Sequence, residues 1–235
     1  MNIFITGTSS GLGYGLAKYY LKEGHNVYGL SRRSNDELNR NAGFSFLQQD
    51  ISDFNSLGKN LPAFLSEVGT IDLVILNAGM LNEIKEMKDT GIDEIKKVMD
   101  VNVWSNKIII DILFSELRHI GQVVAISSGA SISGSQGWNA YSLSKATLNM
   151  LIKLYANEQS NTHFCALAPG LINSAMQEYV AALPKEKDYP TIARLKEVRA
   201  SGKMPGIDEA AETNVRAIEK AKNYDSGSFL DVRNM

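Results

Sequence analysis

The stretch NIFITGTSSGLG, residues 2–13, places a glycine-rich turn between a short apolar run and a helical pattern. The run Asn2–Thr6 predicts a strand, and the apolar spacing over Leu12–Glu23 predicts a helix. Glycines at 7, 11 and 13 allow a tight turn and let a pyrophosphate approach the N–H groups at the start of that helix. The spacing is not G-x-G-x-x-G, so a plain tight connection is the alternative, but the location after the first strand favours a dinucleotide turn.

The same alternation of short apolar runs and longer helical segments continues along the chain. Six further strands are predicted at Asn26–Ser31, Phe44–Gln49, Ile71–Asn77, Gln122–Ser127, His163–Ala168 and Ser228–Val232. Strands that alternate with helices favour a parallel sheet, and runs such as DLVILNAG are apolar enough to be buried from both sides. We find no linker or repeat in the sequence. We therefore predict one α/β domain over residues 1–235, a doubly wound (Rossmann) seven-stranded parallel sheet with helices on both faces.

Composition narrows the class of partner. The 24 basic and 26 acidic residues are interspersed and give a net charge of -2, so no concentrated positive field is available for nucleic acid or an anionic membrane. No apolar run approaches the roughly 18 residues of a membrane span. A single cysteine, Cys165, and an N-terminus without a signal-peptide pattern predict a soluble cytoplasmic protein.

The end of the second predicted strand, GLSRRS, indicates which dinucleotide would bind. In a doubly wound fold this end faces the adenine ribose, and Ser31, Arg32 and Arg33 offer donors suited to a 2′-phosphate where an acidic residue would bond a 2′-hydroxyl. The sequence therefore favours NADP, with NAD possible, although both arginines could instead be solvated on a loop. After the third strand, Asp50 could accept from the adenine amino group or cap the next helix.

A second stretch, YSLSK, sets Tyr141 and Lys145 four residues apart, on one face of a predicted helix. Lowering a phenol from its ordinary pKa near 10 to about 7 requires about 4 kcal/mol. A cation about 4 Å away at an effective dielectric near 20 supplies roughly that amount. Tyr14 and Lys18 have the same spacing but lie in the first helix beside the glycine turn, and we interpret them as structural.

These motifs resemble those of the short-chain dehydrogenases/reductases, and the similarity extends over nearly the whole chain. T-G-x-x-x-G-x-G, N-A-G and Y-x-x-x-K occur in the family's order. The matching positions are Thr6–Gly13, Asn77–Gly79, Asn102, Ser128 thirteen residues before Tyr141, Tyr141–Lys145 and Pro169-Gly170.

The resemblance implies catalytic roles for four of these residues. Tyr141 would give or take the proton of the reacting carbonyl or alcohol oxygen, and Ser128 would stabilise charge on that oxygen. Lys145 would lower the pKa of the phenol and hold the nicotinamide ribose. Asn102 would position a water that links the lysine to solvent. A nicotinamide cofactor supplies the hydride, so no metal is expected, and His25, His119 and His163 show no ligand spacing.

The cofactor-binding residues that we predict combine the glycine turn, the strand ends and the positions carried over from the family. Ser9 and Ser10 could either cap the first helix or bond phosphate oxygens. The full set is Gly7, Ser9, Ser10, Leu12, Ser31, Arg32, Arg33, Asp50, Ile51, Asn77, Ala78, Gly79, Tyr141, Lys145, Pro169, Ile172 and Ser174.

Four further residues need an interpretation. The thirteen-residue spacing selects Ser128, so Ser127 is expected to be structural. Trp138 either lines a substrate pocket or simply packs, whereas Trp104 is assigned to packing. Cys165, within an apolar strand, is expected to be a small buried hydrophobe.

The polar segment 174–205 departs from the alternating pattern, with three of the five prolines and the charged run at 185–188. It is either a solvated surface loop or a mobile lid, and the resemblance favours a lid over the substrate.

Three positions depart from the family pattern. Leu76 stands where many members carry asparagine, Ser174 replaces a frequent threonine, and the C-terminal segment GSFLDVRNM has no glycine pair. The last departure weakens the expectation of a tetramer, while helices around Ile95–Leu117 and Ala140–Glu158 could form a dimer.

The sequence as a whole predicts an NADP-preferring oxidoreductase that interconverts a hydrophobic carbonyl compound and an alcohol, and that forms a homo-oligomer. An epimerase or dehydratase with the same Tyr/Lys pair is less favoured, because such relatives usually have longer chains. A dinucleotide-binding sensor without turnover is the alternative from a different class.

Overall fold

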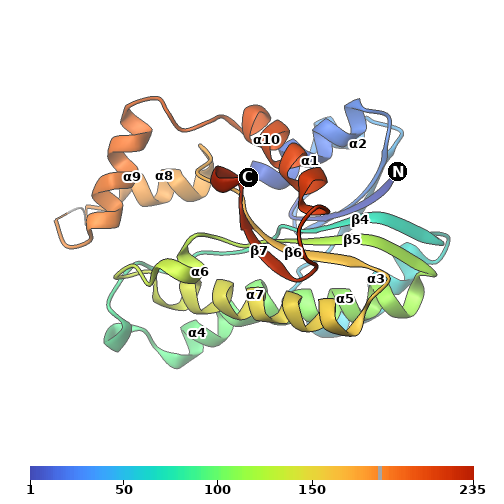
Figure 1. Ribbon diagram of the computed structural model, residues 1–235, viewed down its shortest axis with the longest axis horizontal. Helices are drawn as coiled ribbons and strands as arrows, with labels where there is room; N and C mark the ends of the chain where they lie inside the picture. Colours follow the sequence, from blue (N-terminus) through green and yellow to red (C-terminus); the bar gives the residue numbers. More distant parts are fainter. Residues whose placement is uncertain (185–186) are drawn as a thin grey trace.

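The sheet organises the molecule. A computed structural model describes residues 1–184 and 187–235, and within these residues seven strands form one parallel sheet in the order β3-β2-β1-β4-β5-β6-β7 (Figure 1). The strands are β1 (Asn2–Thr6), β2 (Asn26–Ser31), β3 (Phe44–Gln48), β4 (Thr70–Leu76), β5 (His119–Ile126), β6 (His163–Ala168) and β7 (Ser228–Asp231). The predicted fold is confirmed. The largest boundary difference is at β5, which begins at His119 rather than Gln122.

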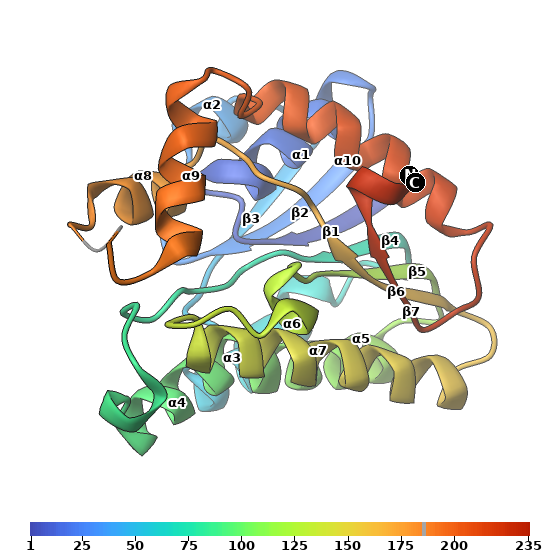
Figure 2. The same ribbon diagram turned by 60° about the vertical axis from the view of Figure 1, so that its left-hand side comes forward.

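Helices cover both faces of the sheet, as Figure 2 shows. One layer contains α1 (Gly11–Lys22) and α10 (Ile207–Ala221). The other contains α3 (Phe54–Leu65), α5 (Ser105–Glu116) and α7 (Asn139–Glu158). Shorter elements are α2 (Asp36–Asn39), η1 (Met87–Asp89), α4 (Ile92–Met99), η2 (Asp100–Trp104), α6 (Ala130–Ser133), α8 (Ala175–Ala182), α9 (Pro190–Ala200) and η3 (Val232–Asn234).

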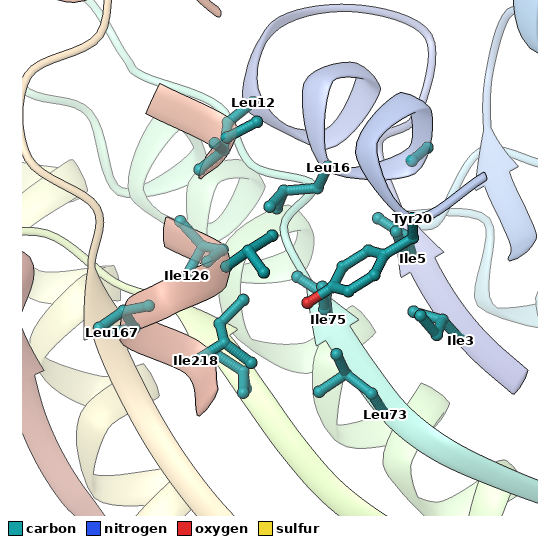
Figure 3. Close-up of a cluster of buried hydrophobic side chains, with 14 of the residues drawn as sticks. Ile3, Ile5, Leu12, Leu16, Tyr20, Leu73, Ile75, Ile126, Leu167 and Ile218 are labelled. Atoms are coloured by element: carbon teal, nitrogen blue, oxygen red, sulfur yellow. The ribbon is translucent and has the colours of Figure 1, made fainter. Parts of the chain in front are cut away.

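Alternation along each strand divides the core between the two layers. In β1, Ile3 and Ile5 pack beneath α1 and α10, while Phe4 packs among the helices of the opposite layer. Figure 3 shows the first of these clusters, in which Tyr20 and Ile218 lie over the strands. Each fully buried side chain of this size contributes roughly 1.5–3 kcal/mol. Cys165 is fully buried in β6, as predicted.

Close packing of α1 against α10 depends on Gly15. A Cβ added there would lie 2.7 Å from Ile207 Cγ2 and 3.1 Å from Ala211 Cβ. The absence of a side chain therefore lets the two helices approach. This contact fixes the start of α1, and with it the glycine turn, over the carboxyl edge of the sheet.

The predicted helix Ile95–Leu117 contains an irregularity that the sequence did not indicate. Between α4 and α5 the chain forms the π-helical turn η2, which includes Asn102. A π-turn inserts an extra residue into the helical repeat and is frequent at functional sites. Trp104, which the sequence assigns to packing, is 42% exposed because this side of η2 faces outward.

The chain changes direction at β1, and this creates a crevice. From β1 it first builds outward to β2 and β3, then returns to place β4 on the other side of β1. The carboxyl ends of β1 and β4 therefore bound a topological switch point, where open α/β sheets bind ligands. Helices α8 and α9 stand beyond this edge (Figure 2). None of the helices in the described ranges combines the length and apolarity needed to cross a bilayer.

Candidate active site

A cavity of about 1180 Å³ opens at the carboxyl edge of the sheet. Its walls come from the segments that follow β1, β2, β3, β4, β5 and β6, together with α7 and the segment that carries α8 and α9. Pockets for drug-sized ligands occupy roughly 300–1,000 Å³, so there is room for a dinucleotide and a second molecule. Every predicted site residue except Asn102 lines this cavity among the described residues.

The glycine turn forms one end of the cavity. Gly7 and Gly11 have φ values of +79° and +61°, which favour glycine. Nothing lies within 4 Å of a Cβ built on Gly11, whereas a Cβ on Gly13 would stand 2.4 Å from Gly7 O. Gly11 therefore leaves the cavity side open, and Gly13 lets α1 pack onto the turn. Ser10 occupies the N-cap position without a side-chain cap hydrogen bond, so its hydroxyl does not cap the helix.

The Asn-Ala-Gly segment after β4 is tied to this turn. The Thr6 hydroxyl accepts from the Asn77 and Ala78 backbone N–H groups at 2.9 and 3.0 Å. Asn77 Nδ2 donates to Thr6 O at 3.0 Å. These bonds hold the ends of β1 and β4 together at the switch point. The open glycine cradle and the adjacent polar wall fit the pyrophosphate and ribose of a dinucleotide.

At the end of β2, Arg32 and Arg33 are exposed and line the cavity. Ser31 differs from the expectation that its hydroxyl is a free donor. Its side chain is buried and donates to Arg33 O at 2.7 Å, which shapes the loop. Gln48 Nε2 donates to Arg32 O at 3.2 Å and supports the same loop. The two guanidinium groups are therefore the side-chain donors that this loop presents to the cavity.

Asp50 lines the cavity beside Ile51. The suggestion that Asp50 caps the next helix is wrong, because Asp53 is the N-cap of α3 and accepts from Ser56 N. Asp50 instead accepts from Ser52 N and Ser52 Oγ, at 2.9 and 2.7 Å. Burial raises the pKa of Asp50, but the bonds from Ser52 and the charge of Arg32 outweigh burial and hold the pKa below its usual value.

Tyr141, Lys145 and Ser128 line the cavity where α7 lies beside the end of β5. Tyr141 and Lys145 lie one turn apart on α7, and Lys145 Nζ stands 5.7 Å from the centre of the Tyr141 ring. Ser128 follows β5, and its hydroxyl lies close enough to the Tyr141 phenol to lower the pKa of that phenol. Both α7 side chains are buried in the protein and line the cavity wall. A hydroxyl, a phenol and an amine therefore face the same space.

The expectation that Lys145 lowers the pKa of Tyr141 to about 7 is not met. Burial raises the pKa of the phenol above its ordinary value, and the Ser128 hydroxyl lowers it less than burial raises it. Lys145 Nζ donates to Ile126 O at 2.7 Å, so the ammonium is held by the end of β5 and not by the phenol oxygen. Burial lowers the pKa of Lys145 to about 8. The same desolvation disfavours both charged forms.

Asn102 lies behind the cavity wall. Its amide bonds the Met80 backbone twice, accepting from Met80 N at 2.8 Å and donating to Met80 O at 2.9 Å, and it also donates to Ser144 Oγ. A Cβ on Gly79 would stand 3.2 Å from Asn102 Oδ1 and 3.5 Å from Lys145 Nζ. Asn102 and Lys145 therefore both lie against the Gly79 backbone, and the amide fixes the wall beside the lysine.

A polar network behind Ser128 was not predicted. Ser131 Oγ donates to Ser128 O at 2.7 Å, and Asn149 Nδ2 donates to Ser131 Oγ at 2.9 Å. Asn149 Oδ1 accepts from Ser127 Oγ, so Ser127 is part of this network, in keeping with its assignment as structural. The spacing 141, 145, 149 repeats every four residues and could have identified Asn149 as a residue on the same face of α7.

A second polar group places the start of α7. Asn82 Oδ1 accepts from Tyr141 N at 3.1 Å, and Asn82 Nδ2 donates to Asn139 Oδ1 at 3.0 Å. Asn139 Nδ2 in turn donates to Lys85 O at 2.9 Å. Both amides are buried. The loop after β4 therefore fixes the backbone of Tyr141, a contact between segments far apart in the sequence.

The described part of the segment 174–205 forms α8 and α9, and residues 185 and 186 of the predicted lid lie outside the described residues. Met176 and Leu195 line the cavity, and Tyr189 packs with Trp138 and Tyr141 in one apolar cluster. Trp138 fits both of its interpretations, since it lines the cavity and meets the Tyr141 ring edge-on at 6.1 Å between ring centres.

Comparison with known proteins places these motifs in context. Residues 1–184 match the sequence model of a protein family that is described as short chain dehydrogenase. A benzil reductase ((S)-benzoin forming) of Bacillus subtilis is 28% identical over 243 residues, which cover 97% of each chain. A benzil reductase ((S)-benzoin forming) of Saccharomyces cerevisiae is 31% identical over 192 residues, which cover 75% of this chain and 73% of that protein. The crystal structure of a short chain dehydrogenase/reductase from Saccharomyces cerevisiae matches this structure with a TM-score of 0.86 at 23% sequence identity. The match covers 98% of this chain and 95% of the other, so the two proteins share a fold.

Proposed function

The chain belongs to the short chain dehydrogenase family, and we propose that it is an NADP-preferring reductase of hydrophobic carbonyl compounds, with Tyr141 as the proton donor. The observation that carries the proposal is that Ser128, Tyr141 and Lys145 line one dinucleotide-sized cavity at the switch point of the sheet. The names of the relatives favour an aromatic 1,2-diketone, such as benzil, as the first substrate to test.

When bound in this cavity, a nicotinamide cofactor would supply the hydride for reduction of the carbonyl group. Tyr141 transfers its hydroxyl proton to the carbonyl oxygen, which balances the reduction to an alcohol. Ser128 donates a hydrogen bond to that oxygen as negative charge develops. Lys145 Nζ, held by Ile126 O and 5.7 Å from the centre of the Tyr141 ring, would place its positive charge near the phenolate that forms. Because the pKa of Tyr141 is raised, the neutral acid is the resting form, as reduction requires.

The proposed preference for NADP rests on Arg32 and Arg33, which are exposed at the cavity wall. Charge-assisted bonds to a phosphate contribute about 1.5–3 kcal/mol each. Asp50 and the loop around Ser31 complete this proposed adenine subsite. The remaining proposed contacts are Gly7, Ser9, Ser10 and Leu12 at the pyrophosphate and Asn77–Gly79, Pro169, Ile172 and Ser174 along the riboses and nicotinamide.

The substrate is proposed to lie between Tyr141 and the described part of the segment 174–205. Apolar side chains from this segment, such as Met176 and Leu195, line the cavity together with Trp138. Such a wall suits an aromatic or aliphatic ketone. It also supports the proposal that the segment covers the substrate and excludes water.

The test combines cofactor binding with turnover. We expect the fluorescence of NADPH to report binding at least tenfold tighter than that of NADH, and Arg32→Ala to remove most of this difference. Arg40→Ala, an exposed arginine at the end of α2, is the matched control. NADPH consumption is then followed with diketones, ketones, aldehydes and quinones. Tight binding without turnover on the whole panel would instead favour a sensor, and equal affinity for NADH would contradict the role of Arg32.

We also propose a homodimer through α5 and α7. Trp104, Leu143, Met150 and Leu154 are exposed apolar residues in η2 and α7. Burying them against a second copy would remove apolar surface from water. Light scattering is expected to give twice the mass of the chain, and Leu154→Glu is expected to shift it toward the monomer. A monomeric wild-type protein would contradict this part of the proposal.

A further inference from the structure

The pair Asp231 and Arg233, in the C-terminal segment, forms part of the cavity wall and has no role in the reaction proposed so far. Arg233 Nε donates to Asp231 Oδ1 at 2.8 Å, and its Nη2 donates to Asp231 Oδ2. Arg233 N also donates to Asp231 Oδ1, at 3.0 Å. The Asp231 side chain is only 7% exposed, whereas that of Arg233 is 58% exposed. A buried carboxylate therefore holds an accessible guanidinium in one orientation.

Neighbouring backbone places the guanidinium beside Ser128. Asp231 ends β7, in register with Ala168 at the end of β6. A Cβ on Gly170 would lie 3.2 Å from Val232 Cγ2, and a Cβ on Gly129 would lie 3.4 Å from Arg233 Nη2. Gly129 directly follows Ser128, the proposed partner of the reacting oxygen. Arg233 Nη2 thus lies close to the residue that follows Ser128.

The hydrogen-bonding capacity of Arg233 is only partly used. A guanidinium has five N–H donors, and the two bonds to the Asp231 carboxylate leave three. Within the described residues, the other N–H groups make no hydrogen bond. The bond between the two side chains lowers the pKa of Asp231 and raises that of Arg233, so both stay charged near neutral pH. The carboxylate is buried but the guanidinium is exposed, so the pair contributes little to stability, and we assign it to orienting Arg233.

We propose that Arg233, oriented by Asp231, is a specificity-determining residue that donates to the second oxygen of a 1,2-dicarbonyl substrate. The inference rests on the proposed carbonyl reduction at Ser128 and Tyr141. In a 1,2-diketone the second oxygen is on the carbon next to the reacting one, so its donor must lie beside Ser128. Because the Asp231 carboxylate offsets the charge of Arg233, this donor suits a neutral carbonyl oxygen better than a carboxylate. Asp231 is a positioning residue.

The test compares benzil with deoxybenzoin, which has the same two rings and one carbonyl fewer. Arg233→Met keeps a side chain of similar length but removes the donors. We expect it to lower kcat/KM for benzil about 10- to 100-fold, while deoxybenzoin changes less than about threefold. Asp231→Asn should show the same selective loss at smaller size, and Arg233→Lys should recover part of it. Arg216→Met, on the exposed face of α10, is the matched control.

Two equilibrium measurements separate this role from others. The affinity for NADPH, followed by its fluorescence, is expected to be unchanged in Arg233→Met, and a loss of tenfold or more would mean that Arg233 holds the cofactor. Binding of benzil and deoxybenzoin to the NADP-loaded protein, followed by tryptophan fluorescence, should show a preference for the diketone that Arg233→Met removes. Equal losses for both ketones, or no loss, would overturn the inference. If the wild-type protein binds benzil preferentially and Arg233→Met removes that preference, but neither ketone is reduced, the proposed function fails while the assignment of Arg233 to the second carbonyl oxygen stands.

Discussion

Two Tyr-x-x-x-Lys pairs occur in this molecule, and they have nearly the same internal geometry. In α1, Lys18 Nζ lies 5.8 Å from the centre of the Tyr14 ring. In α7, Lys145 Nζ lies 5.7 Å from the centre of the Tyr141 ring. The helical spacing alone sets this distance. The pairs must therefore differ through what surrounds them.

The surroundings reverse the electrostatics of the two lysines. The α1 pair is on the surface, where Tyr14 donates to Glu37 and Lys18 forms an ion pair with Asp208. The bond to Asp208 raises the pKa of Lys18, whereas burial lowers the pKa of Lys145 to about 8. Only the α7 pair has a serine from a strand end beside it and lines the cavity, among the residues described. The pattern YxxxK thus predicts only that the phenol and the amine lie close together. Burial at the edge of the sheet is what suits the α7 pair to a chemical role.

The largest expected contrast is between Tyr141→Phe and Tyr14→Phe. Loss of a positioned proton donor reduces rates about 10²- to 10⁴-fold, so Tyr141→Phe should lower kcat/KM for benzil reduction by about 10³. Tyr14→Phe should leave kcat/KM within about twofold, because the Tyr14 hydroxyl bonds the exposed Glu37 and no other side chain among the residues that the structure describes. Steady-state NADPH oxidation measures both. NADPH binding serves as the control for folding, and equal activity of the two variants would remove Tyr141 from the reaction.

A smaller contrast concerns stability against pH. The pKa of Lys145 is lower in the folded than in the unfolded chain, so the unfolded chain binds the proton more tightly between about pH 8 and 10.5. The resulting destabilisation is fully present below about pH 8 and shrinks as the pH rises. Relative to Lys145→Met, the wild-type protein should therefore gain about 2 kcal/mol of unfolding free energy between pH 7 and 9.5, measured by urea denaturation without cofactor.

Lys18→Met provides the control for this measurement. The pKa of Lys18 is raised, so its favourable contribution is present below the unfolded pKa and is lost only above it. The difference between wild type and Lys18→Met should be flat from pH 7 to 9.5. A flat profile for Lys145→Met as well would mean that the ammonium of Lys145 is solvated in solution.

The comparison also shows what sequence could predict. Seven strands were identifiable because strands buried on both faces are apolar throughout, and the two YxxxK pairs were separated by their positions relative to the strand ends. The pairing of Lys145 with Ile126 O, and the amide bonds of Asn102 to Met80, depend on a π-turn and on strand register, which no local pattern encodes. Arg233 reaches the site through a contact with Gly129, about 100 residues away, and follows only from the order of the strands.

A third contrast concerns Ser128, because the α1 pair has no comparable serine beside it in the described part of the chain. Asn149 supports Ser127 directly and Ser128 through Ser131. Asn149→Ala should leave buried partners unsatisfied and loosen Ser128, lowering kcat for benzil about tenfold with NADPH affinity unchanged. Thr147→Ala, at a half-buried position of α7 that bonds only Leu143 O among the described residues, is the control. An equal effect of both changes would indicate a general weakening of α7.

The smallest effect is expected at the surface pair itself. Glu37→Gln removes the charge that faces Tyr14 and Lys18, but the Glu37 and Lys18 side chains are exposed and Lys18 keeps its bond to Asp208. Exposed ion pairs contribute about 0–1 kcal/mol, so the unfolding free energy should change by less than about 0.5 kcal/mol and the Tm by about 2 °C or less. Activity should be unchanged. A larger loss of stability, or any loss of kcat/KM, would mean that the α1 pair is coupled to the adjacent glycine turn, and the division between a structural and a chemical pair would then not hold.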